Sequence, residues 1–417
     1  MTLFKALVVG AAIALPAGIL VTGSFAQTNG APARDALRAG AARVDITPAV
    51  ADLPEPFKTI HDPIFVRALV IDDGKNRAVV VVGDLPTIAV PEFEELKRRI
   101  AATAHAPVQN VLLAVTHAHS AVRIDHVVQG ISIPGSPKIA DMTMAATVEA
   151  VKQATAKLQP ARAGYAEQGD HTVAVLKVES RAGDPIAFLF NSDLPGVGPG
   201  SDSEVGAGAP GAVQRFIERR YGDKAVAIYT KGASGGPPAN GGGRAGGGAG
   251  APTDPNARLA AMGAAVGGQV LTLAEQTHPT SDLKVSGSAK VLQCPGKSTS
   301  PLNLPNRCSD APGSKLPACV FKDTDIDPVK LQVGVLRIGD LSLVQADADI
   351  TQPVWQRFRS AAPANTLLVS LVYGPVHYVI EDSVYAANGY QATASMAKKG
   401  CAADGFVTAA TEMTRRP

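Results

Sequence analysis

Two histidines one residue apart are the clearest chemical signal in the chain. His117 and His119 stand in the stretch VLLAVTHAHS, directly after an apolar run that is typical of a buried strand. Alternate residues of a strand point to the same face, so the two imidazoles can share one site. Histidine is the commonest zinc ligand, and a catalytic zinc usually takes about three protein ligands and a water. The spacing fits zinc ligands, and it fits equally well two histidines that are hydrogen-bonded at the end of a strand.

Carboxylates and tyrosines elsewhere could complete such a site. Asp347 and Asp349, in the stretch DADI, lie on one face just past an apolar strand, where paired carboxylates suit metal ligation or general-base catalysis. Capping of a helix that begins near Pro353 is the alternative role for this pair. The C-terminal stretch YGPVHYVIEDSVYAANGY is dense in tyrosine for a chain that has seven tyrosines. A tyrosine hydroxyl can ligate a metal or stabilise an oxyanion, and aromatic packing is the alternative.

These side chains must be positioned by strands and helices that alternate along the chain. Several of the expected strands are apolar throughout, which indicates that both of their faces are buried. The pattern predicts an α/β protein with a mixed, largely buried β-sheet core flanked by helices. Strands are expected at 42–48, 62–74, 76–86, 108–120, 161–168, 171–180, 185–193, 225–230, 284–293, 330–339, 341–347 and 365–374, and helices at 91–105, 138–158, 211–222, 257–276 and from 402 onward.

The N-terminal residues predict an exported protein. Residues 1–26 combine one early cation, Lys5, with an apolar run and small residues at Ser24 and Ala26, which is the pattern of a secretory signal peptide. Cleavage after Ala26 would leave residues 27–417 as a single domain, in the periplasm or outside the cell. The formal net charge is only +2 and no basic block occurs, so we expect no nucleic-acid partner.

The C-terminal half contains all the cysteines and a glycine-rich segment. An exported chain is expected to pair an even set of cysteines, and three connectivities are open for Cys294, Cys308, Cys319 and Cys401. We expect the bridges to hold an irregular loop between Leu292 and Val320. Residues at about 231–254 are too rich in glycine to bury a core, so this segment is predicted to be a loop.

The order of the motifs resembles that of a known enzyme family. Neutral/alkaline ceramidases and their shorter bacterial relatives carry, in their N-terminal catalytic domain, a similar succession to DITP, DPIFVRALVIDDG, VVVVGDLP, VLLAVTHAHS, LFNSDLPG, APGAVQRFIERRYG, KGASGG and VYGPVHYVIEDSVYAANGYQATAS. The resemblance runs from about Ala39 to nearly the C-terminus, and we expect no counterpart of the immunoglobulin-like C-terminal domain of the longer enzymes. It implies a zinc amidase that cleaves the N-acyl bond of ceramide to sphingosine and fatty acid.

The resemblance also implies roles for single residues. His117 and Tyr378 fall at the positions of zinc ligands, and a ligating glutamate of the family falls near Asp349, which would be a shorter carboxylate. His119 falls at the position of a second functional histidine, which would handle protons. Tyr390 falls at the position of a second active-site tyrosine, which would stabilise the tetrahedral oxyanion.

One departure from the family pattern affects the expected metal site. The second zinc histidine of the family falls at Leu194, whose side chain cannot bind zinc. Asp193, one position away, is the candidate fourth ligand, because a carboxylate is also acceptable to zinc. Even the loss of a group that only orients a ligand lowers metal affinity by roughly 10- to 100-fold.

Two functions are open on this basis. The first is an exported zinc-dependent amidohydrolase that hydrolyses a ceramide-like lipid amide, or another small-molecule amide, with metal-activated water. A lipid substrate would bring this enzyme into contact with a membrane surface. The second is a relative that has lost catalysis and binds an envelope lipid or a partner without hydrolysis. The resemblance implies a Gly-Asp pair in a later loop, where this chain has Gly235 and Gly236. Leu194 and Gly236 therefore favour the second function, whereas the retained histidines and tyrosines favour the first.

Overall fold

The computed structural model describes residues 37–88, 90–124, 127–128, 131–132, 137–168, 173–192, 194, 203–233, 253–301, 315, 321–370, 374–387 and 390–415. Several sequence predictions concern residues outside this set: the signal peptide, Asp193, Gly236 with most of the glycine-rich segment, and the cysteines Cys308 and Cys319. The side chain of Tyr390 lies outside it as well. For these residues the predictions stay predictions.

The larger sheet is mixed, as the sequence predicts. Its strand order is β12-β10-β9-β8-β1-β3-β4-β5. The pairs β4–β5 and β10–β12 are parallel and the remaining neighbours are antiparallel. The strands are β1 (Arg38–Asp45), β3 (Phe65–Asp72), β4 (Arg77–Gly83), β5 (Val111–Val115), β8 (Gln159–Glu167), β9 (Val173–Ser180), β10 (Pro185–Ser192) and β12 (Val226–Lys231).

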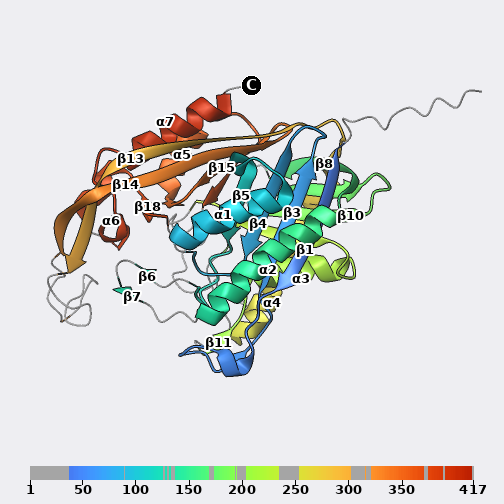
Figure 1. The fold of residues 1–417 in the computed structure, drawn as a ribbon, viewed down its shortest axis with the longest axis horizontal. Coiled ribbons are helices and arrows are strands. Elements are labelled where there is room, and N and C mark those ends of the chain that lie inside the picture. The colour runs from blue at the N-terminus through green and yellow to red at the C-terminus, as the bar shows by residue number, and fades with distance from the viewer. Residues whose placement is uncertain are drawn as a thin grey trace, which may run out of the picture. The chain divides into compact units, whose positions relative to one another are not determined.

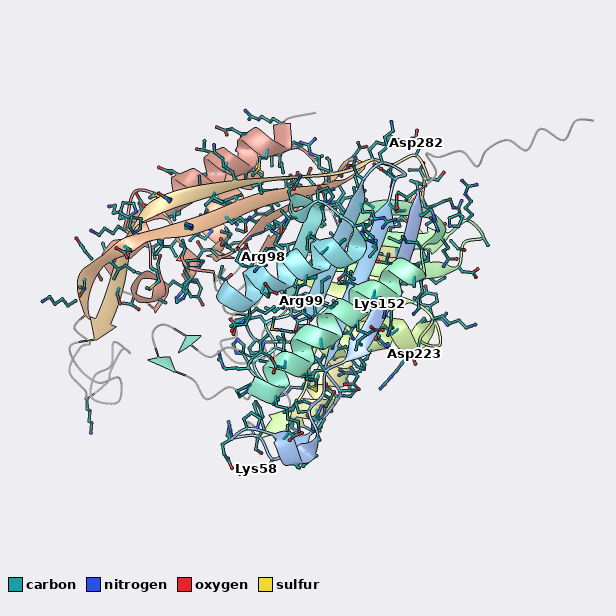
Figure 2. All side chains as sticks on the ribbon, viewed as in Figure 1. Lys58, Arg98, Arg99, Lys152, Asp223 and Asp282 are labelled. Carbon is teal, nitrogen blue, oxygen red and sulfur yellow. A yellow bond between two sulfur atoms is a disulfide. The ribbon has the colours of Figure 1, made fainter. Side chains whose placement is uncertain are left out.

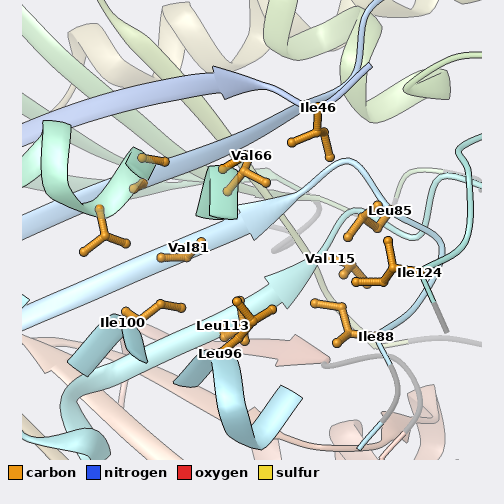
Figure 3. Packing of buried hydrophobic residues seen from close by; sticks show 14 of the residues in the cluster. Ile46, Val66, Val81, Leu85, Ile88, Leu96, Ile100, Leu113, Val115 and Ile124 are labelled. Carbon is orange, nitrogen blue, oxygen red and sulfur yellow. The ribbon is translucent and has the colours of Figure 1, made fainter. Parts of the chain in front are cut away.

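Helices cover one face of this sheet. Helices α1 (Val90–Ala104) and α2 (Pro137–Ala156) lie over β1, β3, β4 and β5, and helices α3 (Gly208–Arg220) and α4 (Pro255–Glu275) lie over the β9, β10 and β12 half (Figure 1). Figure 3 shows the first of these layers, where Leu96 and Ile100 of α1 meet Val81 and Leu113 of the sheet. By length and composition α4 could also cross a membrane, but here it packs against α3 and β9.

The outward faces of these helices carry charge. Figure 2 shows Arg98 on α1 and Lys152 on α2 directed away from the sheet. Their side chains are 67% and 74% exposed, respectively. The apolar residues of α1 and α2 recur at helical spacing and turn inward, which explains why the helices were recognisable in the sequence.

A second sheet packs on the other face of the first, which the sequence analysis did not predict. Its order is β13-β14-β15-β17, from β13 (Val285–Pro301), β14 (Phe321–Ile338), β15 (Leu341–Ala346) and β17 (Thr366–Ser370). Leu336, Leu343 and Val369 of this sheet share one buried cluster with Leu112 and Leu176 of the first. Helices α5 (Gln352–Arg359) and α7 (Ala402–Arg415) cover the outer face of the second sheet (Figure 1). The layers therefore run helix, sheet, sheet, helix.

The remaining described elements are short. They are β2 (Thr59–Ile60) paired with β11 (Glu204–Val205), β6 (Val127–Val128) paired with β7 (Ile131–Ser132), β16 (Asp349–Ile350) paired with β18 (Tyr378–Val379), the 3-10 helices 50–52, 108–110 and 382–387, and α6 (Tyr390–Ala394).

One disulfide is present among the described residues. It joins Cys294, a buried residue of β13, to Cys401, directly before α7. The expectation that the bridges close an irregular loop is wrong for this pair, because Cys294 lies within a strand and its partner is 107 residues away. The bond ties the C-terminal helix to the second sheet.

Candidate functional site

His117 and His119 lie together, but not because of strand alternation. Strand β5 ends at Val115, so both histidines belong to the turn that follows it. His117 has a φ of +60°, in the left-handed region that a non-glycine residue seldom adopts. Its Nδ1 lies 2.9 Å from the carbonyl oxygen of Pro86, and its Nε2 lies 2.9 Å from Nε2 of His119. A turn with one unusual backbone conformation therefore brings the two imidazoles into contact.

The contacts assign the protons on both rings. The Pro86 carbonyl can only accept, so Nδ1 of neutral His117 carries the proton and donates. The lone pair is then on Nε2 of His117, and His119 must donate its Nε2–H to it. Burial, together with the charges of His119 and Lys231, lowers the pKa of His117 to about 4. Burial, Arg123 and Lys231 lower the pKa of His119 too, so both rings are neutral at pH 7.

Asp349 and Tyr378 reach the same region from the second half of the chain. They are register partners in the short parallel pair β16–β18, and both are buried. The Asp349 amide also donates to the carbonyl of His377, at 2.7 Å. The Asp349 charge raises the pKa of His117, so the carboxylate acts electrostatically on that imidazole. Two residues that the resemblance implies as zinc ligands, Asp349 and Tyr378, are thus paired in register, and the Asp349 charge reaches the third, His117.

Lys231, which the sequence did not single out, is the ion-pair partner of Asp349. Lys231 is the last residue of β12, and its Nζ lies 3.0 Å from Oδ1 of Asp349. Both members of this ion pair are buried. Lys231 was included in the predicted glycine-rich loop, but it belongs to the strand. A single cation at the end of the apolar run AVAIYTK was the only sequence signal for it.

Asn191 of β10 fixes the position of the β12 end. Its Nδ2 donates to the Thr230 side chain at 3.0 Å and to the carbonyl of Leu368, on β17, at 2.9 Å. The amide therefore joins the two sheets one residue before Lys231. This bridge places the lysine opposite Asp349, which follows β15 of the second sheet.

The other candidates have different surroundings. Asp347 is buried, and its Oδ1 accepts a hydrogen bond from the backbone N–H of Gln332 at 2.7 Å. Burial raises the pKa of Asp347 to about 7. Neither aspartate caps α5, because Thr351 is the N-cap and makes no side-chain cap bond. Leu194 is buried in the apolar cluster formed by β9, β10, β12, α3 and α4, so its side chain has a packing role. Asp193 and the side chain of Tyr390 lie outside the described residues.

The described residues do not fit a zinc ion. The lone pair of His117 that would bind a metal already accepts from His119, and the Asp349 carboxylate already binds an ammonium. No group of three or more His, Cys, Asp or Glu side chains that could hold a metal occurs in the described part of the chain. The Lys231 ammonium, 3.0 Å from the Asp349 carboxylate, would also repel a dication bound to that carboxylate.

Comparison with known proteins gives the same fold. No protein-family model matches the chain. A solved structure described as a ceramidase complexed with C2 is similar with a TM-score of 0.73 and 17% identity, over 91% of this chain and 75% of that chain. The neutral ceramidase from Pseudomonas aeruginosa is similar with a TM-score of 0.71 and 16% identity, over the same 91% and 75%. The chain therefore has a ceramidase-like fold.

Proposed function

We propose that this protein binds a ceramide-like N-acyl lipid amide at the His117 site and does not hydrolyse it with a metal. The observation that carries the proposal is the buried Lys231–Asp349 ion pair, which places an ammonium group where a metalloamidase needs a free carboxylate ligand. Without a metal, the attacking water keeps a pKa near 15.7 instead of about 7, and the main source of hydrolytic power is lost.

The same side chains suit recognition of a neutral amide. An ammonium has three N–H donors, and the contact with Asp349 uses one of them. A lipid amide carbonyl is a matching acceptor. In the assigned tautomer the Nδ1 atom of His119 is an acceptor, which matches an amide N–H or a hydroxyl of the ligand. The likeness in fold to a ceramidase complexed with C2 supports this class of ligand.

The test combines binding, turnover and metal content on the mature chain. A short-chain fluorescent ceramide in detergent should bind saturably, without release of fatty acid, to protein that contains well under about 0.1 zinc per chain by elemental mass spectrometry. Lys231→Met should weaken ceramide binding at least ~10-fold, since one charge-assisted hydrogen bond is worth about 1.5–3 kcal/mol. Lys177→Met is the matched control, because Lys177 also pairs with a buried carboxylate, Glu179, at 2.7 Å, but on β9. Absence of saturable binding would refute the proposal.

A second candidate function is the zinc-dependent amidohydrolase. It is favoured by the register pairing of Asp349 with Tyr378 and by the action of the Asp349 charge on His117. This function predicts about one zinc per chain and release of fatty acid, with both lost in His117→Ala. A metal-replete chain that turns over ceramide would replace the binding function with this one.

A further inference from the structure

We infer that the free edge of strand β1 is a docking site for a short acidic peptide, which binds in an extended conformation between β1 and the first residues of β10 and β12. The site is a cavity of about 360 Å³, within the range of about 300–1,000 Å³ that is usual for ligand sites. Val226, the first residue of β12, lines the cavity, and Lys231 is the last residue of that strand, roughly 16 Å away at about 3.3 Å per residue. The inference therefore goes beyond the lipid site proposed above and does not rest on it.

Strand β1 has a second neighbouring strand over only part of its length. On one side it pairs with β3 along the whole strand, and on the other side it pairs with β8 only at Arg38 and Ala39. The reason is that β8 begins at Gln159, directly after the turn that ends α2. A Cβ on Gly40 would collide with the carbonyl oxygen of Ala154, so the end of the helix packs against β1 at this point. The rest of β1 has no strand partner on this side in the part of the chain that the structure describes.

The register of the strands shows which backbone groups face the cavity. Just beyond β1, the amide of Ile46 donates to the carbonyl of Ile64 at 2.9 Å. Hydrogen-bonded pairs alternate along an antiparallel ladder, so the even-numbered residues of β1 bond to β3 and the odd-numbered residues face away from it. Ala41 and Arg43, which both line the cavity, therefore each direct an N–H and a C=O toward it.

The edge of β12 is closed, in contrast to that of β1. The backbone N–H of Ala227 donates to Glu218 Oε1 at 3.2 Å, and the backbone N–H of Tyr229 donates to Gln214 Oε1 at 3.1 Å. Both acceptors belong to α3, so side chains of that helix satisfy the donors of the last strand of the sheet. Proteins usually cover or pair the edges of their sheets in this way, and the open groups of β1 remain available to a ligand.

The walls of the cavity favour a negatively charged ligand. They include three basic side chains, Arg43, Lys157 and Lys224, and one acidic side chain, Asp223. The Asp223 carboxylate already pairs with Arg43 at 3.0 Å. Lys157 and Lys224 are exposed and have no ion-pair partner among the described side chains. Two ammonium groups are therefore left to bind acidic groups of a ligand.

An extended peptide matches these features better than a small anion does. Each open residue of β1 presents a C=O acceptor beside its N–H donor, and the acceptors would repel an oxyanion. A strand that adds to a sheet edge satisfies the donors and the acceptors together. Alternate side chains of such a strand point to opposite faces, so acidic ones can reach Lys157 and Lys224 while apolar ones contact Ile186 and Val226.

The test is a fluorescence anisotropy titration of the full chain with a fluorescein-labelled pentapeptide of alternating glutamate and valine. We expect saturable binding in the micromolar range. N-methylation of alternate peptide amides removes the donors that would pair with β1 and should weaken binding at least ~10-fold. A peptide of alternating lysine and valine should not bind, because the cavity already holds unpaired ammonium groups.

Charge variants test the position of the site. Lys157→Gln/Lys224→Gln should weaken binding of the acidic peptide about 10-fold, since two exposed charge contacts are lost. The matched control is Lys152→Gln/Lys290→Gln, which removes two exposed lysines of α2 and β13 and should bind the peptide as the wild type does. Equal thermal midpoints would show that these surface variants fold alike.

Hydrogen–deuterium exchange of the wild-type chain tests the same contact without a variant. The acidic peptide should slow exchange in the segment that contains Ala41 and Arg43. Absence of saturable binding would overturn the inference. So would binding that N-methylation leaves unchanged and that inorganic phosphate displaces, because the cavity would then be a site for an oxyanion and not for a peptide strand.

Discussion

The buried guanidinium of Arg67 gives the sharpest prediction about stability. Arg67 of β3, Asp84, which follows β4, and Glu218 of α3 are all fully buried. The guanidinium donates to Asp84 Oδ2 at 2.7 Å and to Glu218 Oε1 at 2.9 Å. Burial lowers its pKa, but the two carboxylates raise the pKa by more, so the arginine stays charged. Asp84 is thus part of an internal ion cluster.

Substitution of Arg67→Met keeps the aliphatic volume and removes the charge. Asp84 would retain the Gln214 amide at 3.0 Å, and Glu218 would retain Arg43 and the Ala227 amide. Both carboxylates would lose their shared buried cation, and loss of one partner from a buried ion pair costs about 3–5 kcal/mol. Since domains are stable by only about 5–15 kcal/mol, this variant should lose at least about a fifth of its free energy of unfolding.

Urea unfolding followed by far-ultraviolet circular dichroism measures this loss. Arg38→Met is the matched control, because Arg38 lies on the neighbouring strand and donates from an exposed position to the Leu158 carbonyl. It should cost less than about 1 kcal/mol. Adding Glu218→Gln to Arg67→Met should recover about 1–3 kcal/mol relative to additivity. A loss for Arg67→Met no larger than that for Arg38→Met would refute the reasoning.

Three further predictions concern other contacts. Burial raises the pKa of Asp73, but backbone N–H donors lower it by more, so its folded pKa lies below 3.8. Asp73→Asn should therefore cost about 1–3 kcal/mol of the free energy of unfolding at pH 7. In urea unfolding across pH, the difference in this free energy from the wild type should vanish as pH falls through the lowered folded pKa. Gly374→Ala would place a Cβ 1.6 Å from the Asp347 carbonyl oxygen, so its thermal midpoint should fall by several degrees or the chain should fail to fold; an unchanged midpoint would contradict this contact. Cys294→Ser opens a link across 107 residues and should cost about 2–5 kcal/mol by chemical denaturation, whereas a loss below 1 kcal/mol would contradict the bond.

Local patterns determined most of the secondary structure. The run RAVVVVG predicts a strand that is buried on both sides, and β4 has Val79 and Val81 in the layer under the helices and Val80 and Val82 in the layer between the sheets. The helical spacing of apolar residues likewise predicted α1 and α2. The sequence can predict such elements because side chains repeat their direction every two residues in a strand and about every 3.6 residues in a helix, so the pattern is visible within a few residues.

The candidate site could be predicted only in part, because local patterns relate only residues that are close in sequence. The pairing of His117 with His119 followed from their closeness in sequence, although a turn and not a strand brings them together. The ligand roles of Asp349, Tyr378 and Tyr390 came from family resemblance, and these roles stay predictions.

The partners of the buried charges were decided by the tertiary structure alone. Lys231 meets Asp349 across 118 residues, and Arg67 meets Glu218 across 151 residues. No local period carries information about such pairs, because the path of the chain and the stacking of two sheets bring the groups together. A lone lysine at the end of an apolar strand therefore looked like the start of a loop. Only the packing of the second sheet on the first makes it the counter-ion of the carboxylate expected to bind zinc.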